Sequence, residues 1–538
     1  MVLPSLVFIA LATLVSAGIK NYDSPVYKSL FQVPLPIPPI KVPTKVYTSN
    51  GQTIEYYEVE IKPLTQQVYP GLSKTTLVGY DGISPGPTFR MRKGTQAVVR
   101  FINHGTQASS IHLASPGRTH GSYTRAPFDG WAEDTTEVGQ YKDYYYPNGQ
   151  NARTLWYHDH AIDHTAHNAY FGQGMWNNEG EIQSFYNLTA RLIAGLYILH
   201  DDEEQSVPGL PQGAYDIGLV LASKRYNSDG TLWDPDTNGE KTSVFGDVFH
   251  VNGQPWPHLK VEPRKYRFRF LNAAVSRSYQ MYLVADKASN TRVPFTVVGS
   301  DAGLLDSPVP ATQLDISMAE RWEVVVDFSK FAGQNMTLKN NRDVGADQDY
   351  TDTDKISKHS EDEVARKCLL TATLTTASAF HRIGSNYRAS AKLGQPGSTS
   401  QTDTSTKNRL RNVPFPPPAK STTQVDRSFL FGRSGSGGWT INGVTWASGP
   451  EERILAKPQR GNVEVWELKN GGGGWSHPIH IHLIDFQVIS RTGGRPVLEY
   501  EKVALKDVVW LNTGETVRVI ARYAPWDGLY MASLNDET

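Results

Sequence analysis

The sequence predicts an all-β protein made of three similar Greek-key β-sandwich domains, and three observations lead to this prediction. The 538 residues include 46 glycines, 33 prolines, 26 tyrosines and 12 tryptophans, a composition typical of strands joined by turns. Stretches such as Tyr266–Phe270 alternate large apolar with charged side chains, which predicts strands with one packed face and one wet face. The third observation is a unit of turns and strands that occurs three times along the chain.

The repeated unit contains an Asn-Gly or Asp-Gly turn, an alternating strand and an Asn-led turn. Its strand spans residues 97–103, 266–272 and 463–470. Because the copies lie well over a hundred residues apart, they predict separate sandwich domains and not a short-period solenoid. We place the domains at residues 43–202, 203–375 and 423–538, with a linker rich in Ser, Thr and Pro at 376–422.

The N-terminus is typical of an export signal, which we place at residues 1–17. Val2–Ala17 is apolar or small throughout, and Val15-Ser16-Ala17 has the small-x-small pattern of a signal-peptidase site. A membrane anchor is the alternative, but the run is near the lower limit for spanning a bilayer and a proline-rich segment follows it. We therefore expect a secreted, extracellular protein with no membrane partner. Sequons at Asn187 and Asn335 predict a glycoprotein.

Charge and cysteine content exclude several classes of protein. The 53 Lys and Arg residues balance 54 Asp and Glu residues, so nothing favours binding to nucleic acid or to an anionic membrane. A single cysteine, Cys368, excludes an internal disulfide framework and a zinc site built from cysteines. We expect the protein to be a monomer.

Two His-x-His pairs stand out among the fifteen histidines. His158-Asp159-His160 and His480-Ile481-His482 both lie on predicted strands, where a period of 2 places the two imidazoles of a pair on one face, about 7 Å apart. One such pair is more often two hydrogen-bonded histidines on a surface strand. Two pairs at corresponding places in repeated domains indicate metal ligands. His477 precedes the second pair across a proline, so it can point to a different site.

Imidazole clusters without cysteine suit copper or zinc. Zinc hydrolase sites usually add a carboxylate, or use three protein ligands and a water. Here the histidines are shared between the first and last domains, which favours copper at an interdomain surface. The middle domain has Asn272–Ser276 at the equivalent place, with no histidine, and we interpret it as structural.

Five motifs resemble those of the three-domain multicopper oxidases, and within that family the fungal bilirubin oxidases. They are Phe128–Asp134 (FDGWAED), Leu155–Ala161 (LWYHDHA), His250–Pro257 (HVNGQPWP), Val261–Leu271 (VEPRKYRFRFL) and Trp475–His482 (WSHPIHIH). The resemblance extends from about Pro43 to Met531. It implies cupredoxin-like domains, a type 1 copper that oxidises a small organic reductant, and a trinuclear copper cluster that reduces dioxygen to water with four electrons.

The resemblance also implies a role for each histidine of the motifs. Type 2 copper would be bound by His112 and His480, type 3 coppers by His120, His158, His160 and His482, and type 1 copper by His477. Asp129 occupies the place of a carboxylate that relays protons to the cluster; a turn carboxylate that caps Gly130-Trp131 is the alternative. Aromatic residues such as Trp475 would suit a bulky donor, either bilirubin or a related tetrapyrrole or phenol.

Two other functions stay open beside this one. A laccase-like phenol oxidase would share the same copper sites and differ in its donor. A secreted copper-binding β-sandwich protein without turnover would share the fold and the histidines alone.

Three departures from the family pattern affect the expected activity. The segment 114–119, with Pro116-Gly117 at its centre, separates His112 from His120 and cannot continue a strand. A second segment, 174–193, interrupts another strand. After Gly528–Met531 the sequence continues without the family's His-Cys-His motif, the further His and the Met.

The missing motif would supply the type 1 thiolate, on which blue copper depends. Cys368 does not replace it, and we interpret it as a small buried core residue. We expect the third domain to lack its final strand and to expose a sheet edge. We also expect the chain to bind copper partially and to fail as an oxidase. Either the sequence derives from a gene model with unspliced segments, which the three interruptions favour, or it is a true product that has lost activity.

Overall fold

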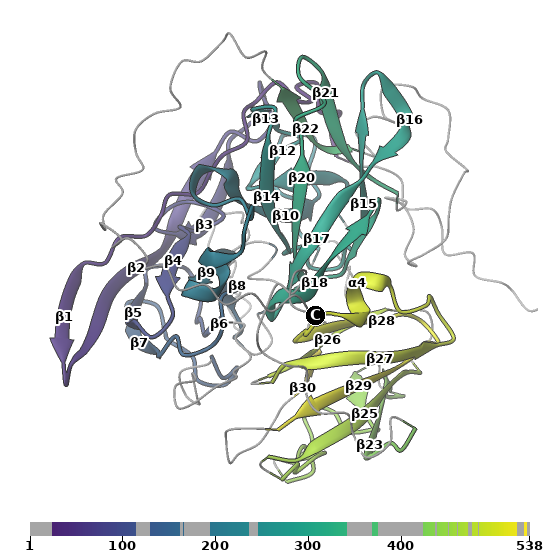
Figure 1. Cartoon of the computed structure of the whole chain (residues 1–538). Coiled ribbons are helices and arrows are strands. Elements are labelled where there is room, and N and C mark those ends of the chain that lie inside the picture. Colours follow the sequence, from purple (N-terminus) through teal and green to yellow (C-terminus); the bar gives the residue numbers. More distant parts are fainter. Residues whose placement is uncertain are drawn as a thin grey trace, which may run out of the picture.

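The structure, a computed structural model, describes most of the chain. The described residues are 24–113, 130–161, 165, 170, 194–235, 246–341, 368–374, 423–435, 438–449, 451–459, 461–471, 476–482, 484–523 and 532–534. Their strands form three groups that lie side by side, β1–β9, β10–β22 and β23–β30 (Figure 1). The all-β prediction is confirmed. The predicted linker and export signal lie outside the described residues, and the predicted domain limits stay predictions.

The first group packs a five-stranded sheet against a four-stranded one. The five-stranded sheet contains β1 (Lys45–Ser49), β2 (Gln52–Gln66), β3 (Thr75–Tyr80), β5 (Gln96–Asn103) and β7 (Tyr141–Tyr146). The other contains β4 (Phe89–Arg92), β6 (Ile111–Leu113), β8 (Arg153–Asp159) and β9 (Ala194–His200). Aromatic rings such as Tyr80, Phe101 and Tyr157 fill the space between the sheets, because alternate residues of each strand point inward.

The second group, the middle domain, follows the helix α2 (Asp202–Ser206) and the 3₁₀ turn η1 (Gly213–Tyr215). Its seven-stranded sheet contains β10 (Asp216–Lys224), β11 (Val248–Val251), β12 (Gln254–Pro255), β14 (Lys265–Asn272), β17 (Phe295–Ser300), β18 (Gly303–Ala311) and β20 (Arg321–Asp327). Its six-stranded sheet contains β13 (His258–Val261), β15 (Tyr279–Ala285), β16 (Ala288–Val293), β19 (Leu314–Ile316), β21 (Asn335–Asn340) and β22 (Cys368–Leu374).

One prediction about the middle domain is wrong. The charged side chains that alternate along Tyr266–Phe270 do not face water: Arg267 is 2% exposed and Arg269 is 0% exposed. Both guanidinium groups pair with carboxylates, among them Glu323 on the neighbouring strand β20. The face that the sequence pattern assigned to solvent is instead an ionic surface covered by the first domain, where Thr154 accepts a hydrogen bond from Arg269.

Residues 24–42 are here called the N-terminal arm; its first part lies against the middle domain, and its end pairs with Thr88 of the first domain. Tyr27 and Leu35 belong to the hydrophobic core of the middle domain, and Leu35 N–H donates to the carbonyl of His258 on β13. The first part of the arm therefore belongs to a domain that begins about 200 residues later in the chain. No pattern in the sequence indicated this placement.

The third group consists of a five-stranded and a three-stranded sheet. The former contains β23 (Arg427–Arg433), β24 (Trp439–Ile441), β25 (Val463–Asn470), β27 (Phe486–Thr492) and β29 (Thr516–Arg522); the latter contains β26 (His477–Ile481), β28 (Val508–Leu511) and β30 (Ala532–Leu534). The short helix α4 (Glu499–Lys502) follows β27. The prediction that this domain lacks a strand after Met531 is wrong, because β30 pairs with β26 and covers the edge that we expected to be exposed.

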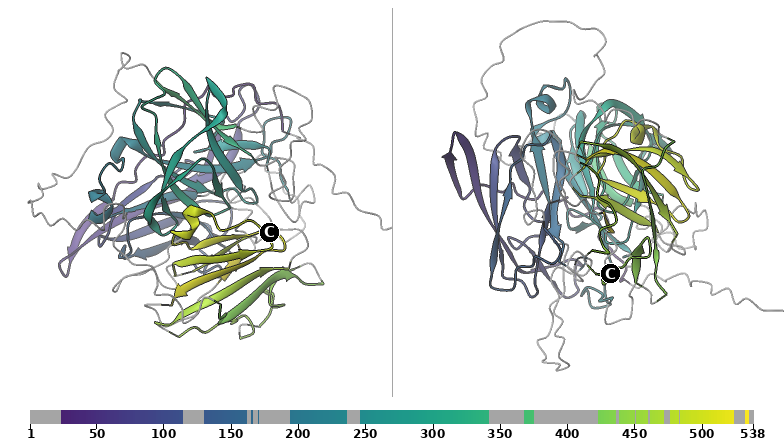
Figure 2. Two further views of the ribbon diagram at one scale, coloured as in Figure 1. Left: turned by 45° about the vertical axis from the view of Figure 1, so that its right-hand side comes forward. Right: turned by 90° about the horizontal axis from the view of Figure 1, so that it is seen from below.

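All three groups meet at one apolar cluster. It contains Trp156 of β8, Leu271 of β14 and Val508 of β28, all less than 9% exposed. Beside it, Arg153 of the first group and Asp485 of the third form a buried bidentate ion pair with N–O distances of 2.9 and 3.1 Å. In Figure 2 the middle group lies above the other two in the left view and between them in the right view. The ends of β8 and β26 therefore face each other across a buried interface.

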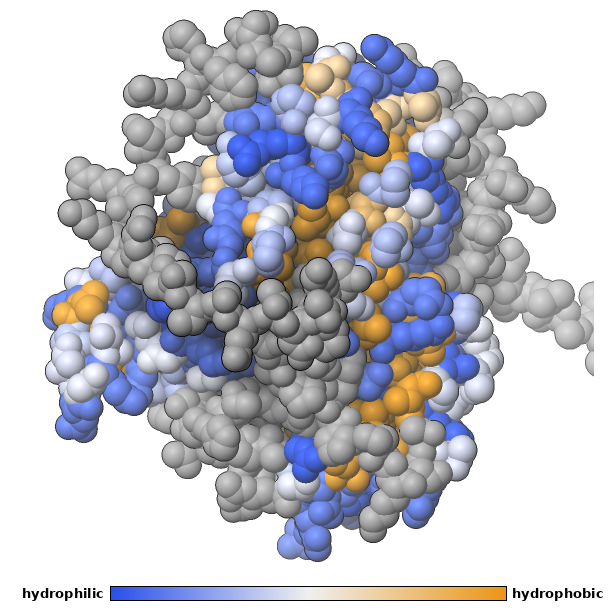
Figure 3. All heavy atoms as spheres, in the orientation of Figure 1, coloured by the Kyte–Doolittle hydropathy of each residue, from blue (hydrophilic) through white to orange (hydrophobic). Residues whose placement is uncertain are grey.

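The visible surface mixes polar and apolar residues. In the orientation of Figure 3, the described surface of the first group is mostly hydrophilic, and apolar residues form a broken band over the middle and third groups. No helix within the described ranges has the length and the apolar character needed to cross a membrane.

Candidate metal site

The first domain contributes three histidines to the site. His112 on β6 lies directly opposite His158 on β8 in the antiparallel register, and His160 follows immediately after β8. Leu155 and Tyr157 point into the core of the first domain, so period-2 alternation turns His158 outward. The ring centroids of His112 lie 5.4 Å from His158 and 5.2 Å from His160.

The third domain contributes two more. Ile479 and Ile481 of β26 belong to the core of that domain, so His480 and His482 face the other way, toward the first domain. The ring of His112 lies 5.7 Å from that of His480 and 4.6 Å from that of His482. One ligand atom from each of these three residues lies within 4.8 Å of the other two. Five imidazoles from two domains thus form one group, the histidine cluster.

The pairs are tighter than a regular strand would make them. Ring centroids are 5.8 Å apart in His158 and His160, and 4.7 Å apart in His480 and His482, against the 7 Å expected. The second histidine of each pair lies just beyond the end of its strand, where the backbone leaves the extended conformation. The five rings can therefore converge on a smaller volume.

The cluster is buried, and three of its imidazoles are poised as neutral ligands. All five histidines are at most 5% exposed. Burial lowers the pKa of His112, His158 and His480 well below the usual value, and the neighbouring imidazoles lower it further. A neutral imidazole has one nitrogen with a free lone pair, which is the form that binds a metal ion.

Hydrogen bonds fix which nitrogen carries that lone pair. His480 Nδ1 lies 2.8 Å from the carbonyl oxygen of Asp507, and His158 Nδ1 lies 2.7 Å from that of Asp159. A carbonyl oxygen can only accept, so Nδ1 of each ring carries the proton and donates it. This leaves Nε2 bare, and Nε2 of His480 is buried with no hydrogen-bond partner among the described residues. A metal ion would satisfy it.

The donor set fits copper. It consists of several neutral imidazoles, with no cysteine or carboxylate in the group of candidate ligand atoms within the described part of the chain. Imidazole suits copper and zinc, and the sharing of ligands between two domains allows more than one ion to be held.

His477 lies apart from the cluster. It shares the core-facing side of β26 with Ile479 and Ile481, is completely buried, and meets the ring of Trp439 edge-on at 4.9 Å. It therefore points away from His480 and His482, as the proline beside it suggested. Cys368 begins β22, in a sheet of the middle domain, whereas His477 begins β26 of the third.

Some predicted site residues lie outside the described residues: His120, Asp129, Trp475 and the segments 114–119 and 174–193. Gly130, next to Asp129, is described. It has a φ of +81°, and a Cβ there would lie 2.3 Å from the carbonyl oxygen of Ile111 and 2.5 Å from Cα of His112. Only glycine permits this close approach of the motif to β6.

Sequence reasoning missed two neighbours of the cluster. The indole of Trp156 stacks on the ring of His158, with centroids 4.0 Å apart and planes 22° apart. Their spacing of two residues on one strand could have indicated this contact. Asp507 and its partner Arg321 lie behind His480, and no local pattern could have placed them there.

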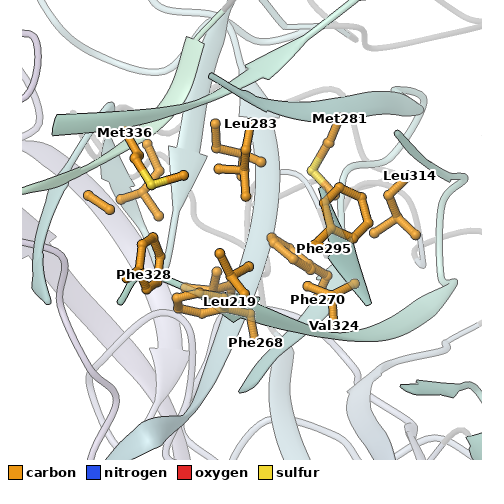
Figure 4. A pocket seen from close by; sticks show the side chains of 14 residues that line it. Leu219, Phe268, Phe270, Met281, Leu283, Phe295, Leu314, Val324, Phe328 and Met336 are labelled. Carbon is orange, nitrogen blue, oxygen red and sulfur yellow. The ribbon is translucent and has the colours of Figure 1, made fainter. Parts of the chain in front are cut away.

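The one cavity that the structure shows most clearly is not the site. It lies inside the middle domain, where fourteen apolar residues, including Phe270, Met281 and Met336, enclose about 30 Å³ (Figure 4). None of these side chains has a group that could ligate copper through nitrogen or transfer a proton. The cavity is a packing defect of the core, and the chemistry belongs to the histidine cluster.

Known families and structures resemble this chain over most of its length. Two family models, both described as multicopper oxidase, match residues 64–179 and 400–532. The bilirubin oxidase of Albifimbria verrucaria is 50% identical over 520 residues, covering 94% of this chain and 79% of that protein. A laccase of Haloferax volcanii is 31% identical over 546 residues, covering 93% of this chain and 81% of that protein.

Solved structures share the fold. A laccase from Pediococcus acidilactici superposes with a TM-score of 0.68 at 21% identity, covering 96% of this chain and 92% of that one. A multicopper oxidase variant from Aquifex aeolicus gives a TM-score of 0.68 at 24% identity, covering 94% and 96%.

Proposed function

The chain belongs to the multicopper oxidase family and is a copper oxidoreductase by that membership, and on this premise we propose that its donor is bilirubin or a related tetrapyrrole or phenol. The bilirubin oxidase that shares 50% of its residues supports this choice. Dioxygen is the acceptor and is reduced to water. The observation that carries the proposal is the histidine cluster, in which the first and third domains supply five buried imidazoles to one space.

The residues of the cluster would divide the metal ions between them. His112 and His480 would hold one copper, and His158, His160 and His482, with His120, would hold a pair. Bound copper would supply reversible one-electron steps, and three ions here together with a fourth at the donor site would supply the four electrons that dioxygen needs. The neutral imidazoles and the burial of the cluster keep competing ligands and bulk water away from the ions.

Asp129 would deliver protons to the cluster. Its neighbour Gly130 lies against the backbone of His112, which supports a place for the carboxylate near the metal site. We expect Asp129→Asn to lower oxygen uptake without changing copper content, because an amide cannot exchange a proton in this way.

Donor oxidation requires a fourth copper, at a second site that includes His477. The sequence holds one cysteine, and Cys368 lies in a sheet of the middle domain, whereas His477 lies in the third domain. We therefore propose that Cys368 is not a ligand of a copper at His477, and that copper binds at the histidine cluster.

The comparison that tests this function uses copper-loaded chains. Copper content and oxygen uptake are measured for the 538-residue chain, for His480→Gln, and for a version with a restored His-Cys-His tail and without the two inserts. His250→Gln serves as a buried control, because His250 lies outside the cluster. We expect His480→Gln to lose copper, His250→Gln to retain it, and the restored version to gain oxygen uptake. Full copper loading of His480→Gln would contradict the proposal.

A laccase-like phenol oxidase is the second candidate, because relatives named as laccases cover more than nine tenths of the chain. Turnover of bilirubin and of a simple diphenol by the restored version separates the two. A ratio in favour of bilirubin supports the first candidate.

We also propose that the enzyme is a secreted glycoprotein. The apolar residues 1–17 with their small-x-small end support secretion, and the sequon at Asn335, on β21, supports glycosylation. Mass spectrometry of the exported protein would show both, and its mass in solution would show whether it is a monomer.

A further inference from the structure

The middle domain contributes no histidine to the cluster. One of its arginines nevertheless lies behind the cluster and contacts all three domains. Arg321 is completely buried at the start of β20. Its Nε donates to the carbonyl oxygen of Thr154 in the first domain at 3.0 Å, and one terminal nitrogen donates to the carbonyl of Ala319 in its own domain at 3.0 Å. Both terminal nitrogens pair with the two carboxylate oxygens of Asp507 in the third domain, one of them at 2.7 Å.

Asp507 connects this arginine to the metal site. Its carbonyl oxygen accepts the proton of His480 Nδ1 at 2.8 Å, and its Oδ1 lies 3.9 Å from the same nitrogen. As this bond holds the proton on Nδ1, it directs the lone pair of Nε2 into the cluster. The orientation of His480 therefore depends on where the backbone of residue 507 lies.

That backbone is held by charges of the middle domain. Asp301 accepts hydrogen bonds from the backbone N–H of Asp507 and Val508, both at 3.3 Å. Asp301 also accepts from the ammonium of Lys506 at 2.9 Å and from the backbone N–H of Arg321 at 2.7 Å. These side chains are 0% exposed, so a lost partner leaves a charge without solvent to stabilise it.

The same arginine also restrains the other half of the cluster. Thr154, Trp156 and His158 point to one side of β8, because they alternate along the strand. Arg321 holds the strand at Thr154, four residues before His158, while it holds Asp507 behind His480. One planar guanidinium thus sets the distance between the two strands that carry the His-x-His pairs.

We propose that Arg321 and Asp507 are positioning residues of the metal site, through which the ligand-free middle domain determines the tautomer and placement of His480. The inference rests on the proposed role of the histidine cluster in binding copper. Residues in this relation to a ligand typically change metal affinity 10- to 100-fold when substituted.

The test compares two variants with a matched control. Arg321→Lys retains the charge but loses the planar fork, and Asp507→Asn retains size and backbone carbonyl but loses the charge. Arg491→Lys is the control, because Arg491 is as deeply buried (1% exposed), pairs with Glu501 and Glu515 of its own domain, and has no histidine among its hydrogen-bond partners. Each full-length chain is titrated with Cu(II) against a competing chelator and examined by electron paramagnetic resonance.

We expect Arg321→Lys and Asp507→Asn to weaken Cu(II) binding at least about 10-fold and to change the copper hyperfine coupling. Arg491→Lys should lower the melting temperature and leave affinity and hyperfine coupling unchanged. Equal affinities in wild type and Asp507→Asn, or equal losses in Arg321→Lys and Arg491→Lys, would overturn the proposal. If Arg321→Lys does not fold, the Cu(II) affinity of Asp507→Asn tests the proposal alone.

A metal-free measurement separates this inference from the proposed function. Histidines labelled with ¹⁵N report the tautomer of His480, assigned by its loss in His480→Gln. We expect the Nδ1–H form in the wild type and a mixture of tautomers in Asp507→Asn. If the wild type binds no Cu(II), the proposed function fails, while the tautomer still decides whether Asp507 positions His480. An unchanged tautomer in both variants would refute the positioning role.

Discussion

The ends of β8 and β26 carry the same His-x-His motif, but different surroundings support them. Behind His158 lies the indole of Trp156, stacked at 4.0 Å and embedded in an apolar cluster shared by three domains. Behind His480 lies Asp507, held in a buried ionic junction. Both rings are hydrogen-bonded to a backbone carbonyl through Nδ1, but the first is backed by apolar packing and the second by buried charges. Equivalent histidines in repeated domains can therefore lose their positions through substitutions of different kinds.

The largest expected effect comes from separating the two strands altogether. Asp485→Ala leaves Arg153 as an unpaired buried charge between the first and third domains, and should lower the free energy of unfolding by about 3 to 5 kcal/mol. Asp143→Ala is the control, since Asp143 and Arg100 form a bidentate pair with side chains more than a quarter exposed, worth less than about 1 kcal/mol. Urea denaturation measures both. Similar losses in the two variants would show that the Arg153–Asp485 pair is no more important than a surface pair.

A smaller loss of stability is expected when the apolar packing beside His158 on β8 is reduced. Trp156→Leu removes the ring that stacks on His158, and should cost about 2 kcal/mol of stability, because leucine refills only part of the space. Cu(II) affinity should also fall severalfold. Trp466→Leu, in the core of the third domain, should cost about the same stability and leave affinity unchanged. Calorimetry measures the stability of both variants, and chelator competition measures their Cu(II) affinity. An unchanged affinity in Trp156→Leu would show that the stacked indole does not position His158.

The pH dependence of the unfolding free energy reports how the buried histidines are protonated. The folded-state pKa values of His112, His158 and His480 are lowered, so in the metal-free protein these residues favour folding above about pH 6.5 and lose that contribution as the pH falls toward their folded-state pKa. Each contributes up to about 1.4 kcal/mol per pH unit in that window. His158→Gln should therefore reduce the slope of unfolding free energy against pH by this amount. A slope equal to that of the wild type would show that His158 is already protonated in the folded state.

The smallest effect concerns His480. The positive charge of Arg321 is among the causes that lower the pKa of His480, and it is not among those for His158. Arg321→Met should therefore raise the pKa of His480 more than that of His158, as measured by NMR of labelled histidines. Equal shifts in both residues would indicate a general loosening of the cluster.

Much of the fold and part of the site could be predicted from local patterns. Alternation along the strands predicted the sandwiches, and two His-x-His pairs at corresponding places predicted that the first and third domains meet. His112 lies on a strand of three residues and entered only through the family resemblance. Period 2 gives the face on which a side chain lies, but it does not give what covers that face.

The buried arginines show why the rest could not be predicted. Arg267 and Arg269 alternate with apolar residues as they would on any half-exposed strand, and only the arrival of another domain distinguishes a wet face from an ionic interface. Arg321 and Asp507 are 186 residues apart in the sequence, and neither lies in a motif that points to the other. Contacts of this kind depend on the assembly of domains and leave no local signal.

The N-terminal arm imposes an order on the synthesis of the protein. Tyr27 and Leu35 leave the ribosome before any strand of the middle domain exists, but their binding surface is complete only when β22 has been made. At 5 to 20 residues per second, the arm waits roughly 17 to 70 seconds with its apolar side chains unburied. During that time it is available to chaperones or to another nascent chain. A segment that is translated early is thus among the last to be packed.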